Sequence, residues 1–170
     1  MEQLTVEEII KYAIRVEQES YQFYRRASRM LAGSELKALV DEFSEHEVGH
    51  MIELKAYIKD DTEVNEKLSR LLTVDTALFD RIIASDDIHP KATPIDILQI
   101  ALERESISRK NYEMLHGLAK IGDDIKSTFW SIMEKADTRM KMIQERVDRL
   151  KRPDDGGTGV SKSVDKGPRP

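Results

Sequence analysis

Residues 43–52 read FSEHEVGHMI, and this stretch is compatible with two folds of different chemistry. His46, Glu47 and His50 match the H-E-x-x-H pattern of zinc metalloproteases, in which two histidines one helical turn apart hold zinc and the glutamate activates water. Glu47 to His50 also match the E-x-x-H pattern of four-helix bundles that hold two metal ions between carboxylates. The rest of the chain decides between the two patterns.

The composition excludes several kinds of site. The 170 residues fit one domain and contain no cysteine, which excludes disulfides, thiolate zinc sites and iron–sulfur clusters and leaves carboxylates and four histidines as metal ligands. A net charge of −5 gives no reason to expect a nucleic-acid partner. The sequence shows no leader pattern and no apolar run near the ~20 residues that cross a bilayer. We therefore expect a cytoplasmic protein with no membrane partner.

Helix signals run through most of the chain. Few glycines and prolines, and no convincing segments of period two, predict an all-α fold. Thr5 and Glu8 form a capping box that begins the first helix, Gly33 ends it, and Thr93-Pro94 begins the third. The predicted helices cover residues 5–32, 34–60, 94–120 and 123–150.

The connection over residues 61–93 is much longer than the other two. At 1.5 Å per residue it can return along a bundle ~40 Å tall, and we expect short helices within it over residues 64–72 and 74–84. Two antiparallel hairpins joined by one long crossover make a ferritin-like four-helix bundle. We assign residues 1–152 to this bundle and expect residues 153–170 to form a disordered tail, because their sequence cannot bury a core.

Each predicted helix carries an acid on its apolar stripe, near its midpoint, when placed on a wheel at ~100° per residue. These acids are Glu17, Glu47, Glu105 and Asp137. His50 shares the stripe of Glu47, whereas His46 lies at its edge. A buried carboxylate costs several kcal/mol unless a positive charge compensates it, so four at one level indicate bound cations. The alternative for any single acid is a side chain that is protonated or reaches solvent.

An internal repeat relates the first and third helices. AIRVEQESYQFY at residues 13–24 aligns with ALERESISRKNY at 101–112, so that Glu17 matches Glu105. A tyrosine follows seven residues later in both, where it can hydrogen-bond a liganding carboxylate or serve as an ordinary core residue. These tyrosines are Tyr24 and Tyr112.

The second and fourth helices align in the same way. The stretch quoted at the start aligns with MEKADTRMKM at residues 133–142. Glu47 then matches Asp137, and His50 matches Met140.

Over about residues 5–150 the chain resembles the rubrerythrin-like branch of the ferritin-like superfamily. The resemblance lies in IRVEQESYQFY, SEHEVGH and ALERESISRKNY, with a weaker match at IMEKADTRM. It implies a non-haem, carboxylate-bridged di-iron protein that reduces hydrogen peroxide or oxidises ferrous iron with O2. It also implies that Glu17 and His50 bind the first iron, Glu47 and Asp137 bridge the two, and Glu105 binds the second.

The chain departs from the family pattern on one side of this site. Met140 stands where the family has its second histidine, and a thioether is a poor iron ligand beside carboxylates. Asp137 is one methylene shorter than glutamate. Arg109, one turn beyond Glu105, could replace a cation as the partner of an acid. The site therefore holds two irons if intact, and one or none if these changes disable it. Because no rubredoxin cysteines are present, the electrons would come from a separate donor protein.

Two other functions stay open. A ferritin-like bundle without metal would serve as a structural or interaction module, with Val16 and Phe23 suited to the face of a homodimer or to packing of the crossover. A zinc hydrolase is the remote alternative, because it leaves the other three acids unexplained and the chain lacks signals for a peptide-binding sheet edge. We expect His89 to lie in a loop and His116 to be a surface or packing residue.

Overall fold

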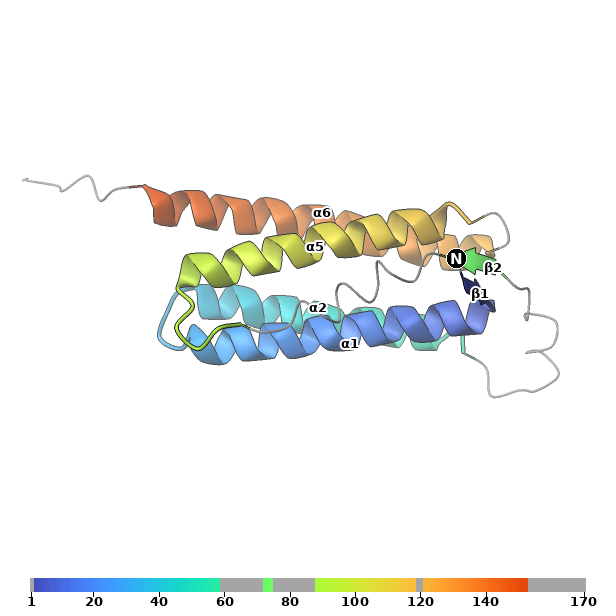
Figure 1. Ribbon diagram of the computed structural model, residues 1–170, viewed down its shortest axis with the longest axis horizontal. Coiled ribbons are helices and arrows are strands. Elements are labelled where there is room, and N and C mark those ends of the chain that lie inside the picture. The colour runs from blue at the N-terminus through green and yellow to red at the C-terminus, as the bar shows by residue number, and fades with distance from the viewer. Residues whose placement is uncertain (1, 59–71, 75–87, 119–120, 153–170) are drawn as a thin grey trace, which may run out of the picture.

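Four long helices dominate the computed structural model (Figure 1), which describes residues 2–58, 72–74, 88–118 and 121–152. None of the helices in this part of the chain combines the length and the apolar composition that a membrane-spanning helix requires. The predicted helical bundle is confirmed.

The first hairpin consists of α1 (Val6–Met30) and α2 (Leu36–Lys55). Thr5 begins α1 because its side chain accepts a hydrogen bond from the backbone N–H of Glu8, while the Glu8 carboxylate accepts one from the N–H of Thr5 at 2.7 Å. Gly33 makes the turn with φ at 83°, a conformation that glycine adopts without steric cost. α2 ends earlier than the predicted residue 60.

The second hairpin consists of α5 (Pro94–His116) and α6 (Asp123–Lys151). Thr93 and Asp96 form another capping box, and Pro94 stands in the first turn, where its missing N–H removes no helical hydrogen bond. α5 also ends before the predicted residue 120, although residues 119–120 lie outside the described part of the chain.

The two hairpins lie side by side as a bundle (Figure 1). Within each hairpin the helices run antiparallel and pack along their length. α2 ends at the end of the bundle where α1 begins, whereas α5 begins at the opposite end. The chain therefore changes ends between α2 and α5, as the predicted crossover requires.

A small antiparallel pairing corrects one prediction within that connection. β1 (Glu2–Leu4) pairs with β2 (Leu72–Val74), with Gln3 opposite Thr73. The short helices predicted over 64–72 and 74–84 are wrong where they overlap β2, and the rest of them lies outside the described residues. Strands of three residues are too short to show an alternating pattern in the sequence. The predicted tail over 153–170 also lies outside the described residues.

A polar layer divides the core into two apolar clusters. The cluster near β1 includes Ile9, Ala13 and Phe129, and the cluster near the α1–α2 turn includes Phe43 and Leu98. Between them, at the middle of the four helices, lie the buried polar residues Glu17, Ser20, Glu47, His50, Arg104, Glu105, Ser108 and Arg139. This layer is where the candidate site is found.

Candidate metal centre

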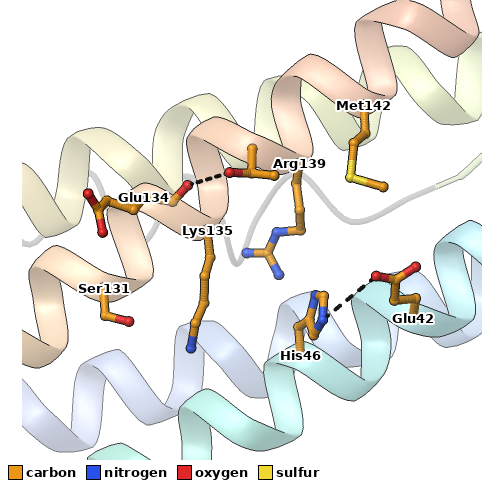
Figure 2. A pocket seen from close by; sticks show the side chains of 8 residues that line it. Glu42, His46, Ser131, Glu134, Lys135, Arg139 and Met142 are labelled. Atoms are coloured by element: carbon orange, nitrogen blue, oxygen red, sulfur yellow. Dashed lines mark hydrogen bonds and ion pairs between the residues drawn. The ribbon is translucent and has the colours of Figure 1, made fainter.

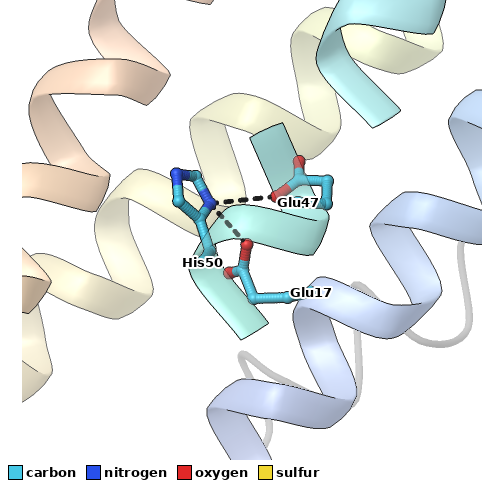
Figure 3. Close-up of side chains that lie close together, drawn as sticks. All are labelled: Glu17, Glu47 and His50. Atoms are coloured by element: carbon cyan, nitrogen blue, oxygen red, sulfur yellow. Dashed lines mark hydrogen bonds and ion pairs between the residues drawn. The ribbon is translucent and has the colours of Figure 1, made fainter. Parts of the chain in front are cut away.

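Two carboxylates and one imidazole converge in the polar layer (Figure 3). Nδ1 of His50 lies 2.8 Å from Oε2 of Glu17 and 3.1 Å from Oε2 of Glu47. Each residue offers one possible ligand atom, and these three atoms lie within 4.8 Å of one another. All three side chains are buried. The predicted convergence of these residues is confirmed.

The helices bring the three side chains together. Glu47 and His50 lie one turn apart on α2, so they project from the same face of the helix. Ala13 on α1 and Phe43 on α2 are fully buried on either side of the layer. The helix faces that carry them, and that also carry the acids, therefore point into the bundle. Glu17 therefore reaches the imidazole from the facing helix.

An arginine joins this cluster to the third acid. Nη1 of Arg139 lies 3.1 Å from Oε1 of Glu47, and its Nη2 and Nε lie 3.0 and 3.1 Å from Oε2 of Glu105. The Arg139 side chain is only 3% exposed. Glu47 thus directs one oxygen to His50 and the other to Arg139.

The two tyrosines of the internal repeat bind the acids crosswise. Tyr24 on α1 donates a hydrogen bond to Oε1 of Glu105 on α5, and Tyr112 on α5 donates one to Oε1 of Glu17 on α1. Of the two alternatives for these tyrosines, the hydrogen bond to a buried carboxylate is the one observed. Each bond joins the two hairpins.

The pKa values of the two acids that contact the imidazole are shifted in opposite directions. Burial raises the pKa of Glu17, but hydrogen bonds with Glu47, His50 and Tyr112 outweigh burial and lower its pKa to about 2. Burial raises the pKa of Glu47 to about 7, because the nearby charge of Glu17 adds to it and Arg139 only partly opposes it. The pair therefore carries a permanent charge on Glu17 and an exchangeable proton near Glu47.

The basic groups of the cluster are held in their charged forms. Burial lowers the pKa of His50, but the hydrogen bonds and charges of Glu17 and Glu47 outweigh it and raise the pKa to about 9. Burial likewise lowers the pKa of Arg139, and the charges of Glu105 and Glu47 raise it well above its ordinary value. Near neutral pH both groups are cations in the metal-free protein.

Asp137 does not join the cluster, and the prediction that it lies inside the bundle is wrong. Its side chain is 43% exposed and accepts a hydrogen bond from Nε of Arg109 at 2.8 Å. Arg109 also pairs with Glu113 at 2.9 Å. Arg109 does partner an acid, as predicted, but at the surface. The arginine that reaches the buried acids is Arg139, which the sequence interpretation missed.

The spacing of apolar residues on α6 contains the signal for Arg139. Buried positions follow one another at intervals of four and three residues, as on a helix that faces a bundle core. They are Ile125, Phe129, Ile132, Ala136, Arg139, Ile143 and Val147, and Met133 is a further buried residue beside Ile132. Arg139 stands in this series and Asp137 does not, whereas Met140 is half-buried beside it.

The first histidine of the H-E-x-x-H pattern lies away from the cluster. His46 is exposed, and its Nε2 lies 3.9 Å from Oε1 of Glu42. The two histidines therefore do not face one site, which disfavours the zinc hydrolase. His89 is exposed in the segment before α5, and the ring of His116 packs against Trp130, as predicted.

A second buried arginine lies next to the cluster. The Arg104 guanidinium stacks over the ring of Phe23 at 4.9 Å, and its Nη2 lies 3.5 Å from Oγ of Ser20.

Val16 and Phe23 are fully buried within the chain. Of the two alternatives for these residues, the dimer face is therefore wrong, and packing of the crossover stays a prediction because most of that connection lies outside the described residues.

The cluster of Glu17, Glu47 and His50 fits a small transition-metal ion. An ion about 2.1 Å from each ligand separates its ligand atoms by about 3–4 Å, and the three possible ligand atoms here lie within 4.8 Å of one another. Two carboxylates and a neutral imidazole suit iron, manganese or zinc, and exclude ions that need thiolate. A bound ion would replace the proton that the imidazole and the carboxylates now share.

Comparisons with protein-family models, with curated proteins and with solved structures give no match to this chain.

Proposed function

We propose that the protein is a ferritin-like bundle, similar to the rubrerythrin-like branch, that binds one iron ion and uses it for redox chemistry on hydrogen peroxide or O2. The observation that carries this proposal is the buried convergence of Glu17, Glu47 and His50. Two antiparallel hairpins whose connected ends lie at opposite ends of the bundle support the ferritin-like arrangement.

The chain's own residues would prepare the site for the ion. Tyr112 holds the Glu17 carboxylate and Arg139 holds the Glu47 carboxylate, so both ligands keep their orientation in the absence of metal. The apolar clusters above and below the layer keep bulk water away from these charges.

The bound iron would supply an open coordination position for the small oxidant and one electron per ferrous-to-ferric step. Reduction of peroxide to water consumes two electrons and two protons, so turnover depends on a separate electron-donor protein. A homodimer stays a prediction, without Val16 and Phe23 as its face.

Elemental analysis of protein purified from iron-replete cells tests the proposal. We expect about one iron per chain in the wild type and none in His50→Ala, which removes the only nitrogen ligand. His46→Ala is the matched control, since it removes the exposed histidine of the same motif and should leave the iron content unchanged. Peroxide consumption, measured with a chemical reductant, should follow iron content across the three proteins.

One observation favours a second function, a metal-free structural or interaction module. The described interior holds three buried acids, two buried arginines and His50, and these charges balance without metal if His50 is protonated and all three acids are ionised. A folded wild type that takes up no iron, manganese or zinc at millimolar concentration would exclude the redox centre and leave this function as the remaining candidate.

A further inference from the structure

We infer that Arg139 is a fixed cation that occupies the place of a second metal ion and limits the centre to one ion. The inference rests on the proposed function, because it concerns the same cluster. Glu47 is the central residue: its Oε2 faces His50, while its Oε1 faces Nη1 of Arg139 at 3.1 Å. On the far side, Oε2 of Glu105 contacts the same guanidinium at 3.0 Å.

The two halves of the cluster have matching parts. In one half Glu17 receives a hydrogen bond from Tyr112 and contacts His50. In the other half Glu105 receives one from Tyr24 and contacts Arg139. The halves differ in one residue. In the first half it is His50 on α2, a potential metal ligand, and in the second half it is Arg139 on α6, a cation.

A guanidinium suits the position between two carboxylates. It stays charged at all accessible pH values and donates in one plane to acceptors on different sides. Without the guanidinium, Glu47 and Glu105 would both be buried acids, and each would have one carboxylate oxygen without a partner. Removing one partner of a buried ion pair is strongly destabilising unless another cation replaces it.

A surface groove borders Arg139 (Figure 2). The groove lies between α2 and α6, has a volume of about 390 Å³, and has Arg139 among the residues that line it. Nη1 of Arg139 has no hydrogen-bond partner among the described residues, although it pairs with Glu47 by charge. Because the same guanidinium lines the groove and contacts both carboxylates, we expect its removal to open the groove toward Oε1 of Glu47 and Oε2 of Glu105.

Titration of the full-length, metal-free protein with Co²⁺, followed by visible absorption and by equilibrium dialysis, tests the inference. We expect one ion per chain for the wild type and two for Arg139→Ala. Arg139→Lys keeps the charge and should bind one ion. The double variant Arg139→Ala/Glu105→Gln should return to one ion, because the second ion loses its ligand. Arg109→Ala removes a surface arginine from α5 and serves as the matched control, with one ion expected.

Thermal unfolding gives a second measurement. Metal-free Arg139→Ala should unfold at a lower temperature than the wild type, and Co²⁺ should raise its unfolding temperature by more than it raises that of the wild type. If Arg139→Ala does not fold without metal, the same titration applies to Arg139→Gln, whose amide still donates to Glu105. The inference would be overturned if Arg139→Ala and Arg139→Gln each bound only one ion. It would also be overturned if two ions still bound after Glu105→Gln.

These outcomes separate the inference from the proposed function. A wild type that binds no Co²⁺ contradicts the one-metal centre. In that case, Arg139→Ala could still bind an ion that Arg139→Ala/Glu105→Gln does not bind, and this result would show that Arg139 excludes a metal. If no variant binds an ion, the inference is overturned as well.

Discussion

Glu17 and Glu47 contact the same imidazole nitrogen and yet have pKa values on opposite sides of the ordinary glutamate value. Glu17 receives hydrogen bonds from Tyr112 and from the imidazole, which stabilise its charge more than burial destabilises it. Glu47 lies beside that charge in the same dry layer, so burial and the charge of Glu17 disfavour its ionisation, and Arg139 opposes them only in part. A pair of this kind can accept a cation in exchange for protons.

The pKa of His50 predicts how the stability of the metal-free protein depends on pH. Its folded pKa of about 9 is above the ordinary value of 6.5, so its contribution is complete below pH 6.5 and is lost as pH rises through 9. We expect the unfolding temperature, measured by circular dichroism with chelator present, to decrease between pH 7 and 9. His50→Gln should lack this decrease. A wild type whose unfolding temperature is constant over this range would contradict the assigned protonation.

At the scale of the helices, the polar layer holds the two hairpins together through the crosswise tyrosines. Tyr24 and Tyr112 each bind an acid on the other hairpin, and both rings are fully buried. Each hydroxyl is thus a charge-assisted donor in a region without competing water.

Tyr24→Phe should therefore destabilise the bundle without changing its packing. Loss of the hydroxyl leaves Oε1 of Glu105 without its donor, and we expect the free energy of unfolding in urea to decrease by about 1–2 kcal/mol. Tyr21→Phe, a half-buried tyrosine on the same helix, is the control and should change stability by less than about 0.5 kcal/mol. Equal effects of the two substitutions would show that the buried hydrogen bond contributes nothing.

The turn between α1 and α2 gives a second prediction for an element. Gly33 has a positive φ with open space where a Cβ would stand, so Gly33→Ala is unfavourable through the backbone alone. We expect a loss of about 1 kcal/mol in urea denaturation. Gly117→Ala is the matched control, because Gly117 has φ at −70° and an added Cβ would make ordinary contacts. A Gly33→Ala variant as stable as wild type would contradict this conformation.

The helices and three of the four predicted buried acids follow from sequence patterns, and the fourth does not. Capping residues locate the starts of α1 and α5, and apolar stripes place Glu17, Glu47 and Glu105 inward. On α6 both the apolar stripe and the repeat alignment predicted that Asp137 faces inward, whereas the structure has Arg139 there. An arginine in a core series is easily read as a surface residue, because its buried position is stable only beside acids from other helices.

At the scale of the molecule, the polar layer divides one core into two. The buried charges of this layer lie between the two apolar clusters, where an uncompensated charge would destabilise the bundle. Sequence patterns could show that acids lie at one level, but not which cations compensate them. That balance depends on contacts between residues far apart in the chain, such as Glu47 with Arg139.

Isothermal titration calorimetry of the metal-free protein with ferrous ion, under anaerobic conditions at pH 8, tests the central claim most directly. We predict saturation at one ion per chain. Comparison of two buffers with different ionisation enthalpies should show release of about one proton per ion, because His50 is mostly protonated at pH 8 and Glu47 mostly is not. Absence of a binding isotherm, or saturation at two ions in the wild type, would contradict a one-metal centre at Glu17, Glu47 and His50.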